Sequence, residues 1–301
     1  MAFYITKISG EKELFDPEKL RRSLHKSKAP ESLINEILQK VENDPSLRTT
    51  QSIYGFAYDC LRQSKPSLAA RYSLKQALIE LGPVGFPFEQ FIAHLFRKEG
   101  YFVETNQIVV GHCVEHEVDV ICSNNKQKFM VECKFHGRPE LKCDVKVSLY
   151  VKARFDDIKE AHVKSAALRQ THNNQEVDGH SHAALRQTQN ERDVDEFHEA
   201  WIVTNTKFTT EAIKFATCRN IQLIGWSIPE GRSLSELVAK YGAHPITALT
   251  SLSGSQKRML IQNNIVLCQD VEKHKNMFKE LGFSHDEIEN LVNEAHEVCT
   301  I

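Results

Sequence analysis

Two glycines and two prolines fall within the six residues 82–87, Gly-Pro-Val-Gly-Phe-Pro. Proline has no backbone N–H and glycine has no strong backbone preference, so neither a helix nor a strand continues easily through such a run. The chain has 301 residues, and a single hydrophobic core seldom grows beyond about 250–300 residues. We therefore place a domain boundary here and divide the chain into residues 1–82, 83–230 and 231–301.

The first 82 residues have the pattern of a β-hairpin followed by four short helices. Residues 3–8 alternate in polarity like a half-buried strand, and 13–15 form the return strand after a Ser-Gly-Glu-Lys turn. Asp16-Pro17 then starts a helix, because an acid is a good N-cap and proline fits the first turn. We expect three further helices, at about 31–43, 50–63 and 67–80.

The middle segment is predicted to form a mixed sheet flanked by helices. An amphipathic helix over 88–100 precedes three strands joined by short turns. Residues 200–226 then follow the order strand, helix, strand, a βαβ unit that makes two strands parallel. The fold class is therefore α/β with mixed α+β character, and residues 231–301 are expected to be helical. The strands are expected at 101–103 with 108–110, 117–122, 128–135, 200–205 and 221–226.

A polar segment over about 160–198 interrupts this pattern. It is rich in Asn, Gln, His, Glu and Asp, and the hexapeptide Ala-Ala-Leu-Arg-Gln-Thr occurs in it twice, at 166–171 and 183–188. Two copies are too few for a solenoid, which needs three or more. We interpret the segment as an insert, with a few helical turns and a mobile loop as the open alternatives.

Composition narrows the class of protein further. The formal net charge is −2, which excludes a strongly basic wrapper of nucleic acid but leaves a local basic face possible. No stretch approaches the roughly 18–20 apolar residues that span a bilayer, and the N-terminus has no signal-peptide core. The eight cysteines form no Cys-x-x-Cys pair, which indicates reduced thiols. We expect a cytoplasmic protein that does not engage a membrane.

Three residues on two neighbouring strands carry the strongest chemical signal. Glu132 and Lys134 alternate with apolar residues, so both project from one face of a buried strand. A hairpin-like turn can bring Asp119, on the preceding strand, beside Glu132. Two carboxylates and the backbone carbonyl of Cys133 form a hard-oxygen site suited to Mg²⁺. The alternative is a charged pair that protects a strand edge, since Asp-x-Lys also occurs at 144–146 and 157–159.

The run from 88 to 135, with His-Glu-Val-Asp-Val at 116–120 and Val-Glu-Cys-Lys at 131–134, resembles the PD-(D/E)xK nuclease superfamily, and most closely its Mrr-like restriction endonuclease branch. The resemblance covers about residues 83–229, with the insert as a departure. It implies phosphodiester cleavage that depends on Mg²⁺ or Mn²⁺. It also implies Asp119 and Glu132 as metal ligands, Lys134 as the catalytic lysine, and Glu89 as the acid of the first helix.

The first 82 residues resemble the ATP-cone, a nucleotide-sensing module. The matching positions include Lys7, Gly10, Lys19 and the Ala-Arg-Tyr at 70–72. The resemblance implies that Lys7, Gly10, Lys19 and Arg71 bind ATP or dATP as a regulator, and lysine ammonium groups do bind phosphates. The family's usual arginine after the strand lysine is Ile8 here. The alternative is a small structural domain that serves dimerisation or DNA contact.

Two further stretches are candidates for phosphate contact. Residues 134–164 carry eight Lys or Arg against five acids and follow the catalytic strand. Residues 245–266 are loosely similar to a helix-hairpin-helix, which would present Lys257 and Arg258 to DNA. A helical cap packed on the nuclease is the alternative for that region.

Together these observations predict a Mg²⁺- or Mn²⁺-dependent DNA endonuclease, regulated by an adenine nucleotide and assembled as a homo-oligomer. The competing prediction is a non-catalytic, nucleotide-responsive DNA-binding regulator that keeps the nuclease fold. Cleavage of RNA or of single strands is a third possibility, which only a panel of substrates separates.

Overall fold

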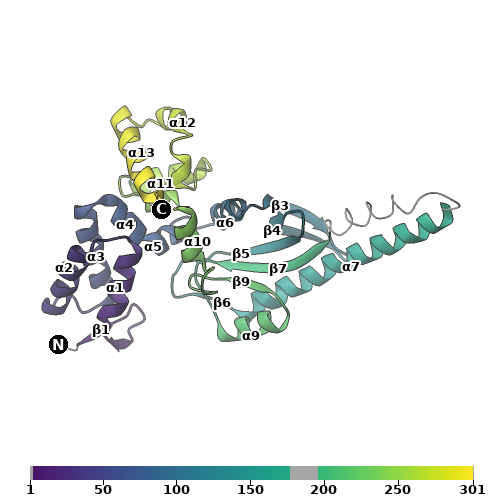
Figure 1. Ribbon diagram of the computed structural model, residues 1–301, viewed down its shortest axis with the longest axis horizontal. Helices are drawn as coiled ribbons and strands as arrows, with labels where there is room; N and C mark the ends of the chain where they lie inside the picture. Colours follow the sequence, from purple (N-terminus) through teal and green to yellow (C-terminus); the bar gives the residue numbers. More distant parts are fainter. Residues whose placement is uncertain (1–2, 177–195, 301) are drawn as a thin grey trace. The chain divides into compact units, whose positions relative to one another are not determined.

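The computed structural model describes residues 3–176 and 196–300, with side chains outside 164–176. The chain forms two compact units (Figure 1). One unit combines Met1–Leu81 with Gly242–Ile301, and the other is Gly82–Tyr241. This grouping differs from the three consecutive segments expected, because the C-terminal helices pack on the N-terminal ones. The boundary at the Gly-Pro run lies one residue from its predicted place.

The N-terminal part of the first unit is a hairpin followed by helices. Asp16 accepts hydrogen bonds from the amides of Glu18 (3.0 Å) and Lys19 (3.2 Å), so it caps the first helix as its sequence predicts. The helix expected over 67–80 is instead two, separated at Ser73. The elements are β1 (Tyr4–Thr6), β2 (Lys12–Leu14), α1 (Pro17–Lys26), α2 (Glu31–Asn43), α3 (Thr50–Ser64), α4 (Pro66–Tyr72) and α5 (Leu74–Ile79).

The C-terminal helices complete this unit. They are η1 (Ile246–Ala248), α11 (Gly254–Gln262), η2 (Cys268–Asp270), α12 (Lys275–Glu280) and α13 (His285–Cys299). Ala70 and Ala77, from α4 and α5, share one apolar core with these helices. The Thr247 hydroxyl also donates a 2.6 Å hydrogen bond to the carbonyl of Ala77. These contacts between distant segments explain why the two ends of the chain form one unit.

The second unit is built on a five-stranded mixed sheet in the order β3-β4-β5-β7-β9 (Figure 1). The pairs β3/β4 and β4/β5 are antiparallel, and β5/β7 and β7/β9 are parallel, which confirms the mixed sheet. The strands are β3 (Phe102–Val110), β4 (Glu115–Ser123), β5 (Lys128–Lys134), β7 (Phe197–Thr204) and β9 (Gln222–Ile224), with a small separate pair of β6 (Lys142–Cys143) and β8 (Lys207–Phe208).

Helices cover both faces of this sheet. On one face, the rings of Phe96 from α6 (Phe86–Lys98), Phe129 and Trp201 pack in edge-to-face and tilted contacts with centroids 5.2–6.0 Å apart. On the other face, α7 (Val145–Glu176) and α9 (Thr210–Cys218) share a buried core with the sheet. The helix α10 (Leu234–Tyr241) contacts α6. Burial on both faces accounts for the unbroken apolar runs 129–131 in β5 and 200–203 in β7.

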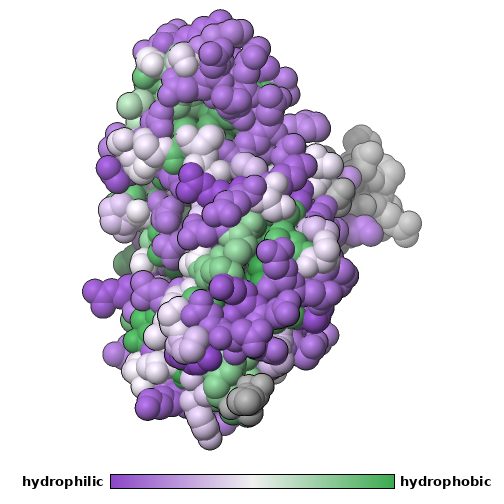
Figure 2. Space-filling model, turned by 90° about the vertical axis from the view of Figure 1, so that its left-hand side faces the viewer, coloured by the Kyte–Doolittle hydropathy of each residue, from purple (hydrophilic) through white to green (hydrophobic). Residues whose placement is uncertain are grey.

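The insert expected over 160–198 lies partly within α7. Residues 160–176, with the first copy of the hexapeptide, are helical, whereas the second copy at 183–188 lies outside the described residues. None of the helices in the described ranges is long and apolar enough to cross a membrane. The face drawn in Figure 2 is mainly hydrophilic, with apolar side chains visible in smaller areas.

Candidate active site

The open end of the β4/β5 hairpin brings two of the predicted acids together. Val120 and Val131 are the last partners of the antiparallel register, so Asp119 and Glu132 are the next residues along the two strands. The amide of Cys133 donates a 2.7 Å hydrogen bond to Oδ2 of Asp119, which fixes that carboxylate against β5. Lys134 follows Glu132 by two residues, so its side chain leaves the same face of the strand.

An irregular residue lies opposite Asp119 on the other neighbouring strand. Thr105 pairs with Val120 and Gln107 with Val118, so Asn106 faces Asp119 without being one of the paired residues. Its φ is +52°, in the left-handed region that asparagine tolerates better than most residues. Strained backbone of this kind concentrates at functional sites. No pattern in the sequence singled out this position.

Glu89 joins the acidic group from α6. It lies in the first turn of that helix, and its pKa is raised to about 7, first by burial and then by the charges of Asp119, Glu117 and Glu132. The carboxylates of Glu89, Glu117, Asp119 and Glu132 therefore interact electrostatically. Glu117 was not predicted as a site residue, although it lies within the His-Glu-Val-Asp-Val run at 116–120.

Burial is the main cause that raises the pKa of both Asp119 and Glu132. The charge of Asp119 raises the pKa of Glu132 further, while Lys134 and Arg154 oppose both shifts. Burial also raises the pKa of the Cys133 thiol well above its usual value, so it remains a neutral thiol. Cys133 thus offers backbone groups rather than a thiolate, and its carbonyl stays the predicted third ligand.

Arg154 also belongs to the candidate site, although no pattern in the sequence singled it out. It lies on α7, and its guanidinium Nη1 donates a 2.5 Å hydrogen bond to Oε2 of Glu132. The only signal in the sequence was the excess of Lys and Arg over 134–164, which does not single out this arginine.

The ligands available here suit a Mg²⁺ ion that keeps several water molecules better than a metal ion held entirely by protein side chains. Among the described residues, no group of three or more His, Cys, Asp or Glu side chains has the geometry to hold a metal ion. Magnesium usually keeps several waters and binds proteins through one or two carboxylates. Asp119 and Glu132, with the carbonyl of Cys133, match that requirement.

The other two Asp-x-Lys patterns have structural roles. Asp144 accepts a 3.0 Å hydrogen bond from the amide of Lys146 at the start of α7. Asp157 accepts from the amide of Cys113 (2.8 Å) and contacts His116 Nε2 (2.7 Å), so it holds the turn between β3 and β4. Of the three acid-x-Lys sequences, Glu132-Cys-Lys134 is therefore the one that lies within the acidic group.

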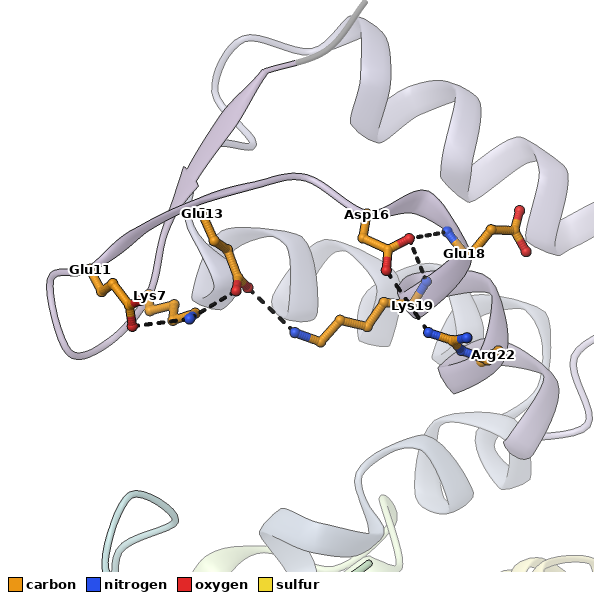
Figure 3. A network of polar contacts seen from close by, with 7 residues as sticks. All are labelled: Lys7, Glu11, Glu13, Asp16, Glu18, Lys19 and Arg22. Atoms are coloured by element: carbon orange, nitrogen blue, oxygen red, sulfur yellow. Dashed lines mark hydrogen bonds and ion pairs between the residues drawn. The ribbon is translucent and has the colours of Figure 1, made fainter.

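The predicted nucleotide residues divide into two places. Lys7 forms ion pairs with Glu11 (3.0 Å) and Glu13 (2.8 Å), and Lys19 pairs with Glu13 (3.4 Å), so both lysines converge on Glu13 (Figure 3). The hydrogen bond from Lys7 is the main cause that lowers the pKa of Glu13. Gly10 lies in the hairpin turn with φ +85°, a conformation that glycine adopts without strain.

Arg71 has a different environment. Its guanidinium donates to the carbonyls of Glu297 (2.5 Å), Val298 (3.3 Å) and Thr300 (3.1 Å) at the end of α13. A cation commonly stabilises the last carbonyls of a helix in this way. The structure therefore brings Lys7 and Lys19 together but engages Arg71 with the C-terminal helix. Lys257, a predicted DNA contact, pairs with Glu80 (3.6 Å).

Three comparisons relate the chain to known proteins. The family model described as AF1548-like, C-terminal, matches residues 244–299. An uncharacterized protein of Archaeoglobus fulgidus is 32% identical over 208 residues, which cover 69% of this chain and 99% of that protein. A crystal structure titled as a protein of unknown function, AF1548, superposes with a TM-score of 0.53 at 29% identity and covers 72% of this chain and 98% of that chain.

Proposed function

We propose that the acidic group on β4, β5 and α6 hydrolyses phosphodiester bonds of DNA with Mg²⁺ or Mn²⁺ as cofactor. The chain that carries this group belongs to the AF1548-like family. The observation that carries this proposal is the charge of the site. Four interacting carboxylates face two cations, Lys134 and Arg154, which leaves an excess of two negative charges when all the acids are ionised. A divalent cation offsets that excess.

Each residue has a defined task in this proposal. A bound Mg²⁺ would polarise a phosphodiester oxygen and acidify a water molecule. Asp119 and Glu132 would hold it, and the amide of Cys133 keeps the Asp119 carboxylate in a fixed orientation. The ammonium group of Lys134 would orient the attacking water or stabilise the charge that develops on the phosphate. Glu89, with a pKa of about 7, is able to exchange a proton near neutral pH.

The hairpin of the first unit supports regulation by ATP or dATP. Lys7 and Lys19 meet at Glu13, so two ammonium groups are available at one place for phosphate oxygens if Glu13 releases them. Titration calorimetry with ATP and dATP tests this role, with Lys7→Ala as the comparison. Heat from the wild-type protein that Lys7→Ala abolishes supports the role, and no heat in either sample contradicts it.

Location and assembly are part of the proposal. All eight cysteines are free, which supports a reducing compartment such as the cytoplasm. Assembly as a homo-oligomer remains a prediction from the sequence, and sedimentation of the full chain checks it.

The decisive experiment is cleavage of supercoiled plasmid with Mg²⁺, compared with the same reaction in EDTA. We expect Mg²⁺-dependent nicking by the wild-type chain, and its loss in Lys134→Ala and Glu132→Ala. Equal nicking by all three proteins would contradict the assignment of this site. If the wild-type chain binds DNA but cleaves neither plasmid, single strands nor RNA, the result would favour the non-catalytic regulator.

A further inference from the structure

Arg154 is the most buried charged side chain of the candidate site. It is 5% exposed, and its guanidinium contacts Glu132 through Nη1 at 2.5 Å. The guanidinium carbon also lies 5.0 Å from the ring centroid of Tyr150, one turn earlier on α7. The side chain is thus held between an aromatic ring and a carboxylate.

The environment of Arg154 is that of a counterion. A buried guanidinium is costly unless it is paired, and Glu132 is the carboxylate that pairs with it. The same positive charge also acts on Asp119. Arg154 Nε is buried and has no hydrogen-bond partner within the part of the chain that the structure describes. Its hydrogen-bonding capacity is therefore only partly used by Glu132.

We propose that Arg154 is a positioning residue that holds Glu132 in place of a divalent cation, and so sets the cation concentration at which the site fills. This inference rests on the proposed function, because it takes Glu132 as a metal ligand. Arginine and the cation would share one carboxylate and repel each other, so the positive charge of Arg154 opposes binding of the cation. Arg154 therefore lowers the affinity for the cation while it stabilises the cation-free protein.

The test is the affinity of the full chain for Mn²⁺, measured by titration calorimetry at pH 8 for every variant. Arg154→Met removes the competing charge and keeps a long apolar side chain for packing. A charged hydrogen bond of this kind is worth about a factor of ten or more in an equilibrium constant. We expect Arg154→Met to bind Mn²⁺ about tenfold more tightly than wild type, or tighter still.

A neighbouring lysine provides the matched control. Lys152 lies on the same helix, and it pairs with Asp156 rather than with the site. Lys152→Met also removes one positive charge, so it separates competition for Glu132 from a general change of charge. We expect its Mn²⁺ affinity to stay within about twofold of wild type. Equal tightening by both variants would overturn the proposal, as would unchanged or weaker binding by Arg154→Met.

Glu132→Gln separates failure of this inference from failure of the proposed function. If wild type and Glu132→Gln bind Mn²⁺ equally, the metal site itself is wrong. If Glu132 is required but Arg154→Met does not change the affinity, only the role of Arg154 is wrong. Arg154→Gln gives a second test should the methionine variant unfold, because it also removes the competing charge and keeps a polar side chain beside Glu132. We expect its Mn²⁺ affinity to exceed that of wild type, and an unchanged affinity would overturn the inference.

Discussion

Replacing Glu89 by glutamine should stabilise the protein at alkaline pH and have no effect in acid. The carboxyl of Glu89 is partly buried beside three other acids, and its pKa is raised from 4.5 to about 7. A carboxyl whose pKa is higher in the folded state favours folding most below its unfolded pKa. That stabilisation is lost as the pH rises from about 4.5 through about 7. Glutamine has a similar shape and carries no charge at any pH, so it avoids the loss.

The size of the effect follows from the pKa. A rise from 4.5 to about 7 corresponds to an upper bound of about 3 kcal/mol at pH 8. The side chain is only partly buried, and screening by solvent reduces the value to about 1–2 kcal/mol. For a unit of this size, that free energy corresponds to an increase in Tm of about 2–8 °C.

Thermal unfolding at pH 8 and at pH 4.5 measures this effect directly. We expect Glu89→Gln to unfold at a higher temperature than wild type at pH 8 and at the same temperature at pH 4.5. Glu104→Gln is the control, because Glu104 is exposed on β3 and its loss should leave Tm unchanged at both values. A Glu89→Gln variant that is less stable than wild type at pH 8 would refute the electrostatic account of the site.

Three further substitutions test the packing of the two units. Glu294 accepts hydrogen bonds from the amide (2.6 Å) and hydroxyl (2.8 Å) of Thr250. Glu294→Ala should therefore lower the free energy of unfolding in urea by about 2–4 kcal/mol. A decrease below about 1 kcal/mol would contradict this role of Glu294. A Cβ at Gly82 would lie 2.3 Å from the Phe135 ring, so Gly82→Ala should lower the free energy of unfolding by about 1–3 kcal/mol, and an unchanged value would argue against that close approach. The hydrogen bond with His116 is the main cause that lowers the pKa of Asp157. Asp157→Asn should therefore lower Tm at neutral pH, and the difference from wild type should shrink as the pH falls. A difference that does not change with pH would contradict this explanation.

The acids of the site were predictable because short-range rules place them. Alternation along β5 puts Glu132 and Lys134 on one face, and a hairpin connection brings Asp119 alongside. Both rules depend only on neighbouring residues and on one turn. The mixed sheet followed in the same way, from a hairpin and a βαβ unit.

Arg154 and the grouping of the two chain ends depend on packing that no local pattern encodes. Arg154 meets Glu132 only because α7 lies on that face of the sheet, and other basic residues of 134–164 were equal candidates. Arg71 fitted a motif position, yet it contacts the end of α13, more than 220 residues later in the chain. The break at Ser73 likewise separates two helices within a continuous helical pattern.

The most direct test of the central claim is the single-turnover rate of plasmid nicking in Mg²⁺ by wild type and by Asp119→Asn, together with the affinity of both for the same DNA. Asparagine keeps the shape of Asp119 and removes the negative charge. We expect the nicking rate to fall by about a hundredfold or more while DNA affinity is retained. A variant that nicks at the wild-type rate would contradict the claim that these acids form a phosphodiester-cleaving site.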